Sequence, residues 1–336
     1  MGPYRKFRLT MRAYLSRGAF SAGPMGTLAK AATMLLPCLL LLQAPMRVSA
    51  QTMPIIDLHF HADQVWDVQA LVKLFDELGV AAAGNGARGS DELALKFAEQ
   101  YPGRFIPFGG NEPIRGFISR GGERAYTLQD PEVVAYLERL EAALRNGQFK
   151  GIGELVVNSI HSRSDKPSKY PADSALMQRL WALSATYGIP LSAHMDATSD
   201  SIAQMERLLA SDRRGTWIWA HTGWSADSSP MLLRGLLQAH PNLFCELSGR
   251  ESIRRIYRGD PIDEGGALKP AWKTLLEEFP DRFVIGTDID PATLEMYREE
   301  IGYWRGILTQ LSPQTAAKLA HENAERLLKL PAVARR

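Results

Sequence analysis

The sequence predicts an α/β protein of the (β/α)8 TIM-barrel class with one extra helix at the C-terminus. Three observations favour this class. Strands and helices alternate about eight times, the loops after strands are longer than the loops before them, and polar residues gather where strands end. The chain has 336 residues, 45% of them hydrophobic, which is enough for one large core. We therefore expect residues 51–336 to form a single domain.

The first expected strand is 54–61, whose bulky and β-branched residues are typical of a strand buried on both faces. Apolar residues at helical spacing, together with capping signals, then predict helices at 67–78, 91–100, 132–144, 174–186, 201–210, 231–239, 270–279, 291–308 and 313–330. Apolar runs between these helices predict the other strands, at 80–83, 105–109, 149–157, 189–194, 217–221, 243–247 and 283–288.

The lengths of the connections give an independent argument. Helix-to-strand connections are short, as at 146–148 and 187–188. Strand-to-helix connections are long, at 110–130, 158–173, 222–230 and 248–269. A barrel builds its active site from the second kind of connection. A doubly wound open sheet is the alternative fold, but no glycine-rich phosphate loop follows the first strand, which weakens it.

Two histidines, His59 and His61, close the first strand with one residue between them. Because side chains alternate along a strand, both imidazoles point to one side, with Cα atoms roughly 6.5 to 7 Å apart. That spacing lets both rings reach one metal ion. The side chain of Asp57, two residues before His59, is expected on the same side of the strand but deeper in the barrel. On this stretch alone, a strand with two satisfied polar residues remains an equal alternative.

Further polar residues stand at the ends of later expected strands, namely Glu154, His194, His221 and Asp288. Four of the seven histidines of the chain fall at strand ends in this way. The strands of a barrel converge at one rim, so these side chains and the first two histidines are expected to meet there. Their chemistry predicts a divalent metal site, with Zn²⁺ as the expected ion.

This set of residues resembles the amidohydrolase superfamily, and within it the amidohydrolase-2 branch of TIM-barrel metal-dependent hydrolases, which includes lactonases and related decarboxylases. The resemblance is carried by DLHFH at 57–61, SAH at 192–194, AHTG at 220–223, GTD at 286–288 and NAERL at 323–327. It implies metal ligands at His59, His61 and His194. It also implies that His221 is a ligand or a substrate-polarising residue, and that Asp288 is a ligand and general base.

The number of metal ions depends on Glu154. Many members of the superfamily bridge two metals with a carboxylated lysine or a glutamate on the fourth strand. Lys150 begins that strand at the wrong end of the barrel, whereas Glu154 lies nearer the productive end. Either Glu154 bridges two ions, or it orients a histidine that binds one.

The expected chemistry is hydrolysis. A cation held by imidazoles and a carboxylate lowers the pKa of its water toward neutrality and polarises a carbonyl oxygen. Asp288 can take the proton of that water and pass it to the leaving group. We expect an ester, lactone or amide-like substrate. A metal-dependent non-oxidative decarboxylase of a carboxylic acid, and a non-catalytic metal- or ligand-binding barrel, are the alternatives.

Three residues near the expected rim are candidates for contact with a small-molecule substrate. Arg250, the first of three arginines after the seventh strand, could hold a substrate carboxylate, with a solvated surface arginine as the alternative. Trp224 follows His221 and could wall the pocket, and His161 lies in the long loop after the fourth strand. Whether the substrate is anionic is therefore left open by the sequence.

The first fifty residues differ from the rest of the chain. They contain basic residues, no acidic residue, and an apolar run at 34–42 that is too short to span a bilayer. With the small residues at 48–50, this composition predicts a signal peptide over 1–50 and a periplasmic or secreted protein. An uncleaved membrane anchor is the alternative. The true start could also be Met11 or Met25.

Removal of this segment changes the charge of the chain. It carries seven of the 39 basic residues and none of the 37 acidic ones, which leaves 32 basic residues against 37 acidic ones. A mildly acidic chain has no electrostatic footprint for nucleic acid. Cys245 would be the one remaining cysteine, so no intramolecular disulfide is expected. We expect no membrane contact after cleavage. The sequence leaves open whether the protein forms a homo-oligomer.

Overall fold

The computed structural model describes residues 53–84, 90–159, 170–223, 228–253, 261–290 and 293–333. The signal peptide predicted at 1–50 and the substrate candidates His161 and Trp224 lie outside these residues. All described residues belong to one compact unit. None of the helices in the described ranges is long and apolar enough to cross a membrane.

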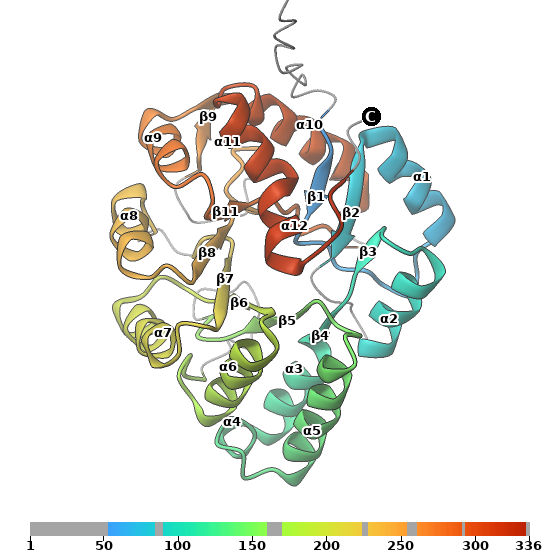
Figure 1. The fold of residues 1–336 in the computed structure, drawn as a ribbon, viewed down its shortest axis with the longest axis vertical. Helices are drawn as coiled ribbons and strands as arrows, with labels where there is room; N and C mark the ends of the chain where they lie inside the picture. The colour runs from blue at the N-terminus through green and yellow to red at the C-terminus, as the bar shows by residue number, and fades with distance from the viewer. Residues whose placement is uncertain are drawn as a thin grey trace, which may run out of the picture. The chain divides into compact units, whose positions relative to one another are not determined.

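Parallel strands make up the centre of this unit (Figure 1). One sheet has the order β1, β2, β3, and a second has the order β11, β8, β7, β6, β5, β4. Their bounds are β1 (Ile55–Asp57), β2 (Val80–Gly84), β3 (Phe105–Ile106), β4 (Phe108–Gly110), β5 (Gly151–Val156), β6 (Pro190–His194), β7 (Thr216–Ala220), β8 (Leu243–Glu246) and β11 (Phe283–Val284).

The two sheets join into a ring at both ends. Only Pro107 separates β3 from β4, and because proline has no N–H it interrupts the strand hydrogen bonds without ending the strand. On the other side, Leu58 N donates to Ile285 O at 2.9 Å, and Phe60 pairs with Ile289 in parallel. Counted with β3 and β4 as one, the described parallel strands of this ring number eight, and the predicted (β/α)8 barrel is confirmed.

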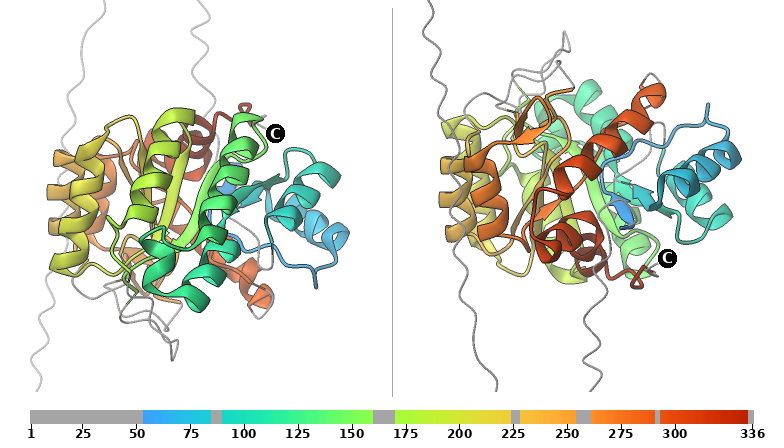
Figure 2. Two further views of the ribbon diagram at one scale, coloured as in Figure 1. Left: turned by 90° about the horizontal axis from the view of Figure 1, so that it is seen from below. Right: turned by 90° about the horizontal axis from the view of Figure 1, so that it is seen from above.

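Helices cover the outside of the strands (Figure 2). Those at the predicted positions are α1 (Val68–Leu78), α2 (Asp91–Gln100), α5 (Pro131–Arg145), α6 (Ala175–Tyr187), α7 (Ser199–Ser211), α8 (Pro230–Ala239), α9 (Pro270–Glu278) and α10 (Tyr297–Leu308), the last preceded by the short η1 (Leu294–Met296). Side-chain caps explain several of their starts, because Asp67, Ser174 and Ser229 each accept a backbone N–H of the first turn.

Two of the expected loops contain regular structure. The connection 110–130 holds α3 (Asn111–Gly121) and α4 (Glu123–Tyr126), so the prediction of a plain loop there was wrong. This helix contains a proline and glycines, which are rare inside helices, but Ile114 is buried and fixes α3 to the core. The connection 248–269 holds the antiparallel pair β9 (Asp263–Glu264) and β10 (Ala267–Leu268).

The predicted C-terminal helix is divided into α11 (Pro313–Ala317), η2 (Lys318–Glu322) and α12 (Asn323–Leu328). Apolar strand residues such as Ile56 and Phe244 form one buried cluster with Ala324 and Leu328. Asn323 Nδ2 donates to Phe283 O at 2.8 Å, at the start of β11. The C-terminal helix therefore packs at the amino ends of the strands (Figure 1), and the opposite rim carries the predicted site.

Candidate metal centre

The two histidines that follow β1 face one another, as predicted. His59 and His61 are buried, and their Nε2 atoms lie 3.2 Å apart. Asp288 Oδ1 lies 3.1 Å from His61 Nε2 and 3.4 Å from His59 Nε2. Two neutral imidazoles that both present a lone pair repel one another at this distance unless a proton or a cation lies between them. The positions of His59, His61 and Asp288 are therefore those expected of side chains that bind one cation together.

Glu154, the fourth residue of β5, lies between two pairs of histidines. Its Oε2 is 3.3 Å from His59 Nε2 and 3.5 Å from His61 Nε2. Its Oε1 is 3.4 Å from His194 Nδ1 and 3.4 Å from His221 Nε2. All six residues that the sequence predicted for the metal site therefore converge on one another.

The distances fit a metal ion. A tetrahedral ion with bonds of about 2.0 to 2.1 Å holds its ligand atoms roughly 3.3 Å apart. Groups of three residues with candidate ligand atoms within 4.8 Å of one another occur among the described residues as His59–His61–Glu154, Glu154–His194–His221 and His59–His221–Asp288. Buried imidazoles with two carboxylates are the donor set that Zn²⁺ and other divalent ions accept.

Asp57 fixes β1 to the segment that carries Asp288. Its Oδ1 accepts hydrogen bonds from His59 N at 3.1 Å and Thr287 N at 3.0 Å, and its Oδ2 accepts one from Thr287 Oγ1 at 2.7 Å. Asp288 N in turn donates to His59 O at 2.6 Å. Burial raises the pKa of the Asp57 carboxyl to about 6, although these hydrogen bonds oppose the shift. The two motifs around 57–61 and 286–288 are thus joined by backbone and carboxylate contacts.

Three site residues have left-handed backbone conformations, with φ of 56° at His221, 56° at Thr222 and 50° at Asp288. Such a conformation costs a non-glycine residue about 1 to 3 kcal/mol and persists only when its surroundings hold it. Contacts from β8 and the segment after it hold His221 and Thr222. His221 N donates to Glu246 Oε2 at 3.1 Å, and Thr222 Oγ1 donates to Glu246 O at 2.6 Å.

Arg250 contributes to the same restraint. Its side chain donates to His221 O at 2.8 Å, to Thr222 O at 3.0 Å and also to Gly223 O. The residue is 2% exposed and its guanidinium lies over the Trp272 ring. The alternative of a solvated surface arginine is therefore wrong. Its observed contacts position the backbone beside His221, and its predicted role in holding a substrate stays a prediction.

Glu246, which is fully buried at the end of β8, was not predicted as a site residue. Its Oε2 lies 2.8 Å from His59 Nδ1, on the side of that ring away from the metal site. The same signal that identified Glu154, a charged residue at the end of an apolar strand, was present at 243–247. Ser159 was missed as well, and its Oγ lies 3.2 Å from His194 Nε2.

A family model described as amidohydrolase matches residues 56–330. The chain belongs to this amidohydrolase family. The match covers the barrel and the C-terminal helix together, and it includes every residue of the metal centre. The protein is therefore an enzyme of a metal-dependent superfamily, and the predicted relationship is confirmed.

Solved structures with the same fold accompany this match. A 2,6-dihydroxybenzoate decarboxylase from Rhizobium is 15% identical, with 83% of this chain and 99% of that chain covered and a TM-score of 0.52. A 5-carboxyvanillate decarboxylase from Novosphingobium aromaticivorans, complexed with manganese, is 14% identical over 83% of this chain and 97% of that chain, with a TM-score of 0.53.

A protein from Acinetobacter baumannii described as a 2-pyrone-4,6-dicarboxylic acid hydrolase, with citric acid bound, is 12% identical over 82% of this chain and all of that chain, with a TM-score of 0.52. No curated protein matches this chain. At such low identities the structural likeness of this amidohydrolase establishes its fold alone.

The electrostatics of this amidohydrolase site favour a cation. Burial would raise the pKa of Glu154, but in the metal-free protein the charge of His59 and the adjacent His194 and His221 rings together hold it well below its ordinary value. The pKa of Asp288 is lowered as well, since the charge of His59 and the contacts with His61 and His221 together outweigh burial. Without a metal, nearby carboxylates raise the pKa of His59 against the effect of burial, whereas burial lowers the pKa of His221.

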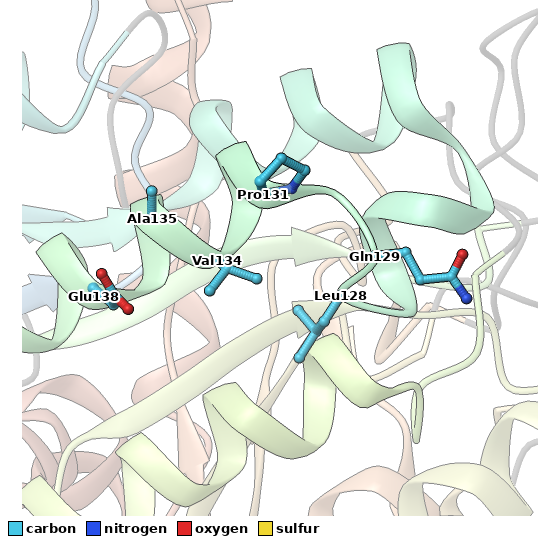
Figure 3. A pocket seen from close by; sticks show the side chains of 6 residues that line it. All are labelled: Leu128, Gln129, Pro131, Val134, Ala135 and Glu138. Carbon is cyan, nitrogen blue, oxygen red and sulfur yellow. The ribbon is translucent and has the colours of Figure 1, made fainter.

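A hollow elsewhere on this amidohydrolase has none of these features. It measures about 400 Å³ and lies at the start of α5, lined by Leu128, Gln129, Pro131, Val134, Ala135 and Glu138 (Figure 3). Glu138 is its single ionisable residue, and none of the residues of the metal centre lines it. It is separate from the site described above.

Proposed function

We propose that this amidohydrolase is a hydrolase that uses metal-activated water to cleave an ester, lactone or amide-like bond. Asp288 is the observation that carries the proposal. Its side chain is 22% exposed, whereas the side chains of the other five cluster residues are 0 to 13% exposed. A carboxylate that reaches both strand-one histidines and still faces solvent is placed to exchange protons with water.

The residues fit one or two ions, and we propose two. His59, His61 and Asp288 would hold one ion, and His194 with His221 the other. Glu154 would bridge them, because its two oxygens face different histidine pairs. When bound, such a centre supplies Lewis acidity and lowers the pKa of a water. We propose Zn²⁺ from the histidine-rich donor set, with Mn²⁺ as the alternative, since related decarboxylase structures contain manganese.

The chain itself would then handle the protons. Asp288 takes a proton from the attacking water and delivers it to the leaving oxygen or nitrogen. In the metal-free protein its lowered pKa keeps it ionised, which is the form of a carboxylate that can accept a proton. His221, whose pKa burial lowers, stays neutral and presents its Nε2 lone pair to a cation or its substrate. Both groups therefore hold the protonation state that hydrolysis requires.

A non-oxidative decarboxylase is the second candidate. The similar solved structures include a 2,6-dihydroxybenzoate decarboxylase and a 5-carboxyvanillate decarboxylase, so an aromatic acid is a reasonable substrate class to test. The same metal centre would serve either reaction. A small-molecule acid as substrate is thus part of this second proposal.

A labelled-water assay separates the two candidates. Chelator-treated protein, with and without restored Zn²⁺ or Mn²⁺, is incubated in oxygen-18 water with lactones, esters, amides and hydroxybenzoates. We expect metal-dependent product that carries one labelled oxygen. Release of carbon dioxide without incorporation of the label would establish the decarboxylase and overturn the hydrolase. Activity that survives complete metal removal would contradict both.

We also propose export to the periplasm or beyond, supported by the basic and apolar composition of residues 1–50. N-terminal sequencing of the protein from its native host is the test. We expect a chain that begins at or near Gln51 in the soluble extracellular or periplasmic fraction. A full-length chain retained in the membrane fraction would favour the uncleaved anchor instead.

A further inference from the structure

We propose that Glu246, assisted by Ser248, is a positioning residue that determines which ring nitrogen of His59 and of His221 faces the metal centre. This inference rests on the metal centre of the proposed function. It adds a role for two buried residues that the hydrolytic scheme above does not use.

The contact to His59 defines its tautomer. Glu246 Oε2 lies 2.8 Å from His59 Nδ1, and both oxygens of this carboxylate already accept hydrogen bonds, from Ser248 N and from His221 N, so the contact to His59 is one more that the carboxylate accepts. The proton of a neutral His59 ring must therefore sit on Nδ1. The lone pair of Nε2 then points at Glu154, Asp288 and His61. A histidine ligand oriented by a carboxylate behind it binds metal more tightly.

The second histidine is fixed from the same direction. His221 Nδ1 lies 3.2 Å from Ser248 O and 3.0 Å from Ser248 Oγ. A carbonyl oxygen only accepts, so this ring also carries its proton on Nδ1 and presents Nε2 to Glu154. Glu246 Oε2 additionally accepts the backbone N–H of His221. One carboxylate thus orients a ligand from each half of the centre.

Glu246 is itself held rigidly. Its Oε1 accepts Ser248 N at 2.5 Å, and its Oε2 accepts Ser248 Oγ at 2.9 Å. Gly286 closes the space on another side, since a Cβ there would lie 2.3 Å from Glu246 Oε1 and 2.4 Å from the Cβ of His59. The absence of a side chain at 286 is what allows the carboxylate to lie against His59.

The other two histidines provide a contrast within the same site. His194 faces Glu154 through Nδ1, and its Nε2 lies near Ser159. His61 Nδ1 is buried and has no hydrogen-bond partner among the described residues. The ring nitrogen that faces the centre therefore differs between its histidines: it is Nε2 in His59 and His221, where an acceptor lies behind Nδ1, and Nδ1 in His194.

Replacement of the carboxylate by an amide should disturb this choice. In Glu246→Gln the NH₂ group replaces one oxygen, so either His59 Nδ1–H or Ser248 N–H would face a donor. Transfer of the His59 proton to Nε2 would relieve the first conflict, but that proton would then block the metal. We expect the affinity for Zn²⁺ to fall by about 10- to 100-fold.

A matched control is available at the other end of the barrel. Glu206 Oε1 lies 3.0 Å from His240 Nε2, remote from the metal centre along the strands. Glu206→Gln makes the same chemical change in a more exposed glutamate–histidine pair, and we expect unchanged Zn²⁺ affinity. Affinities of both variants and the wild type are measured by competition with a chromophoric chelator, on the full chain.

Nitrogen NMR tests the inference without any activity assay. In wild-type protein loaded with Zn²⁺ and labelled with nitrogen-15 at histidine, we expect His59 and His221 to bind through Nε2 with Nδ1 protonated, and His194 to bind through Nδ1. This spectrum needs no variant, so it decides the question even if Glu246→Gln does not fold.

The outcomes separate this inference from the proposed function. Binding of His59 through Nδ1, or wild-type Zn²⁺ affinity in Glu246→Gln, would overturn the positioning role whatever the enzyme hydrolyses. The expected ring nitrogens and the expected affinity loss, found in a protein that hydrolyses nothing, would support the positioning role and count against the proposed hydrolase.

Discussion

Individual polar residues in this protein act in two layers. Six side chains at strand ends face one another, and a second set, among them Asp57, Glu246 and Arg250, holds them in place. The first layer was predictable from sequence, since every member stands at the end of an apolar strand. The positioning contacts of Arg250 were not predictable, because they depend on the path of the backbone after β7.

Asp57→Ala should weaken both the fold and the site. It leaves the buried N–H groups of His59 and Thr287 without their acceptor, and we expect a loss of about 2 to 4 kcal/mol in the free energy of unfolding. Asp57→Asn keeps an acceptor for both groups and should lose less than half of that. Denaturant unfolding of the two variants measures the difference. Equal losses would show that the carboxylate oxygens do not carry the connection.

Metal binding should release a proton at neutral pH. Neighbouring carboxylates raise the pKa of His59 well above 6.5 in the metal-free protein, so its ring is charged at pH 7. A metal at Nε2 displaces that proton, and apparent affinity should therefore rise with pH, about tenfold per unit for one proton, until the raised pKa is passed.

The raised pKa has a matching effect on the metal-free fold. The stabilisation from the charged His59 is fully present below pH 6.5 and is lost as pH rises through the folded-state pKa.

The protons released on metal binding can be counted directly. Calorimetric titration with Zn²⁺ in two buffers of different ionisation enthalpy gives their number. Absence of any proton release at pH 7 would contradict a charged His59.

At the scale of elements, hydrophobic periodicity and helix-capping residues predicted most strands and helices, but they did not predict the irregular segments. The helix α3 was missed because proline and glycine within it resemble a loop, and its burial against the barrel decides its structure. The left-handed backbone of His221 and Thr222 after β7 was also not predicted, since neither residue type by itself indicates a positive φ as glycine does.

Arg250→Ala should release the segment after β7. Three backbone carbonyls lose a charged donor, and we expect about 2 to 4 kcal/mol lower stability together with weaker metal binding through His221. Arg250→Lys should recover only part of this, because one ammonium group does not reproduce the planar fork.

Thermal unfolding and steady-state kinetics check the role of Arg250. Wild-type stability of Arg250→Ala, combined with a raised KM for anionic substrates and an unchanged KM for neutral ones, would instead place Arg250 at the substrate.

At the scale of the whole molecule, the barrel brings together residues that are 230 positions apart in sequence, since Thr287 N donates to Asp57 Oδ1. Sequence pattern predicted this closure through strand count and loop lengths. It did not predict how the ring closes, with β1 against the segment after β11, because those contacts are backbone hydrogen bonds between distant residues.

The central claim is that the cluster is a metal centre in two halves bridged by Glu154. The most direct test is the number of Zn²⁺ ions that chelator-treated protein binds tightly, in the wild type and in Glu154→Ala. We expect two ions in the wild type and one, held by His59, His61 and Asp288, in the variant. One ion in both proteins would contradict the bridge, and none in the wild type would contradict the metal centre itself.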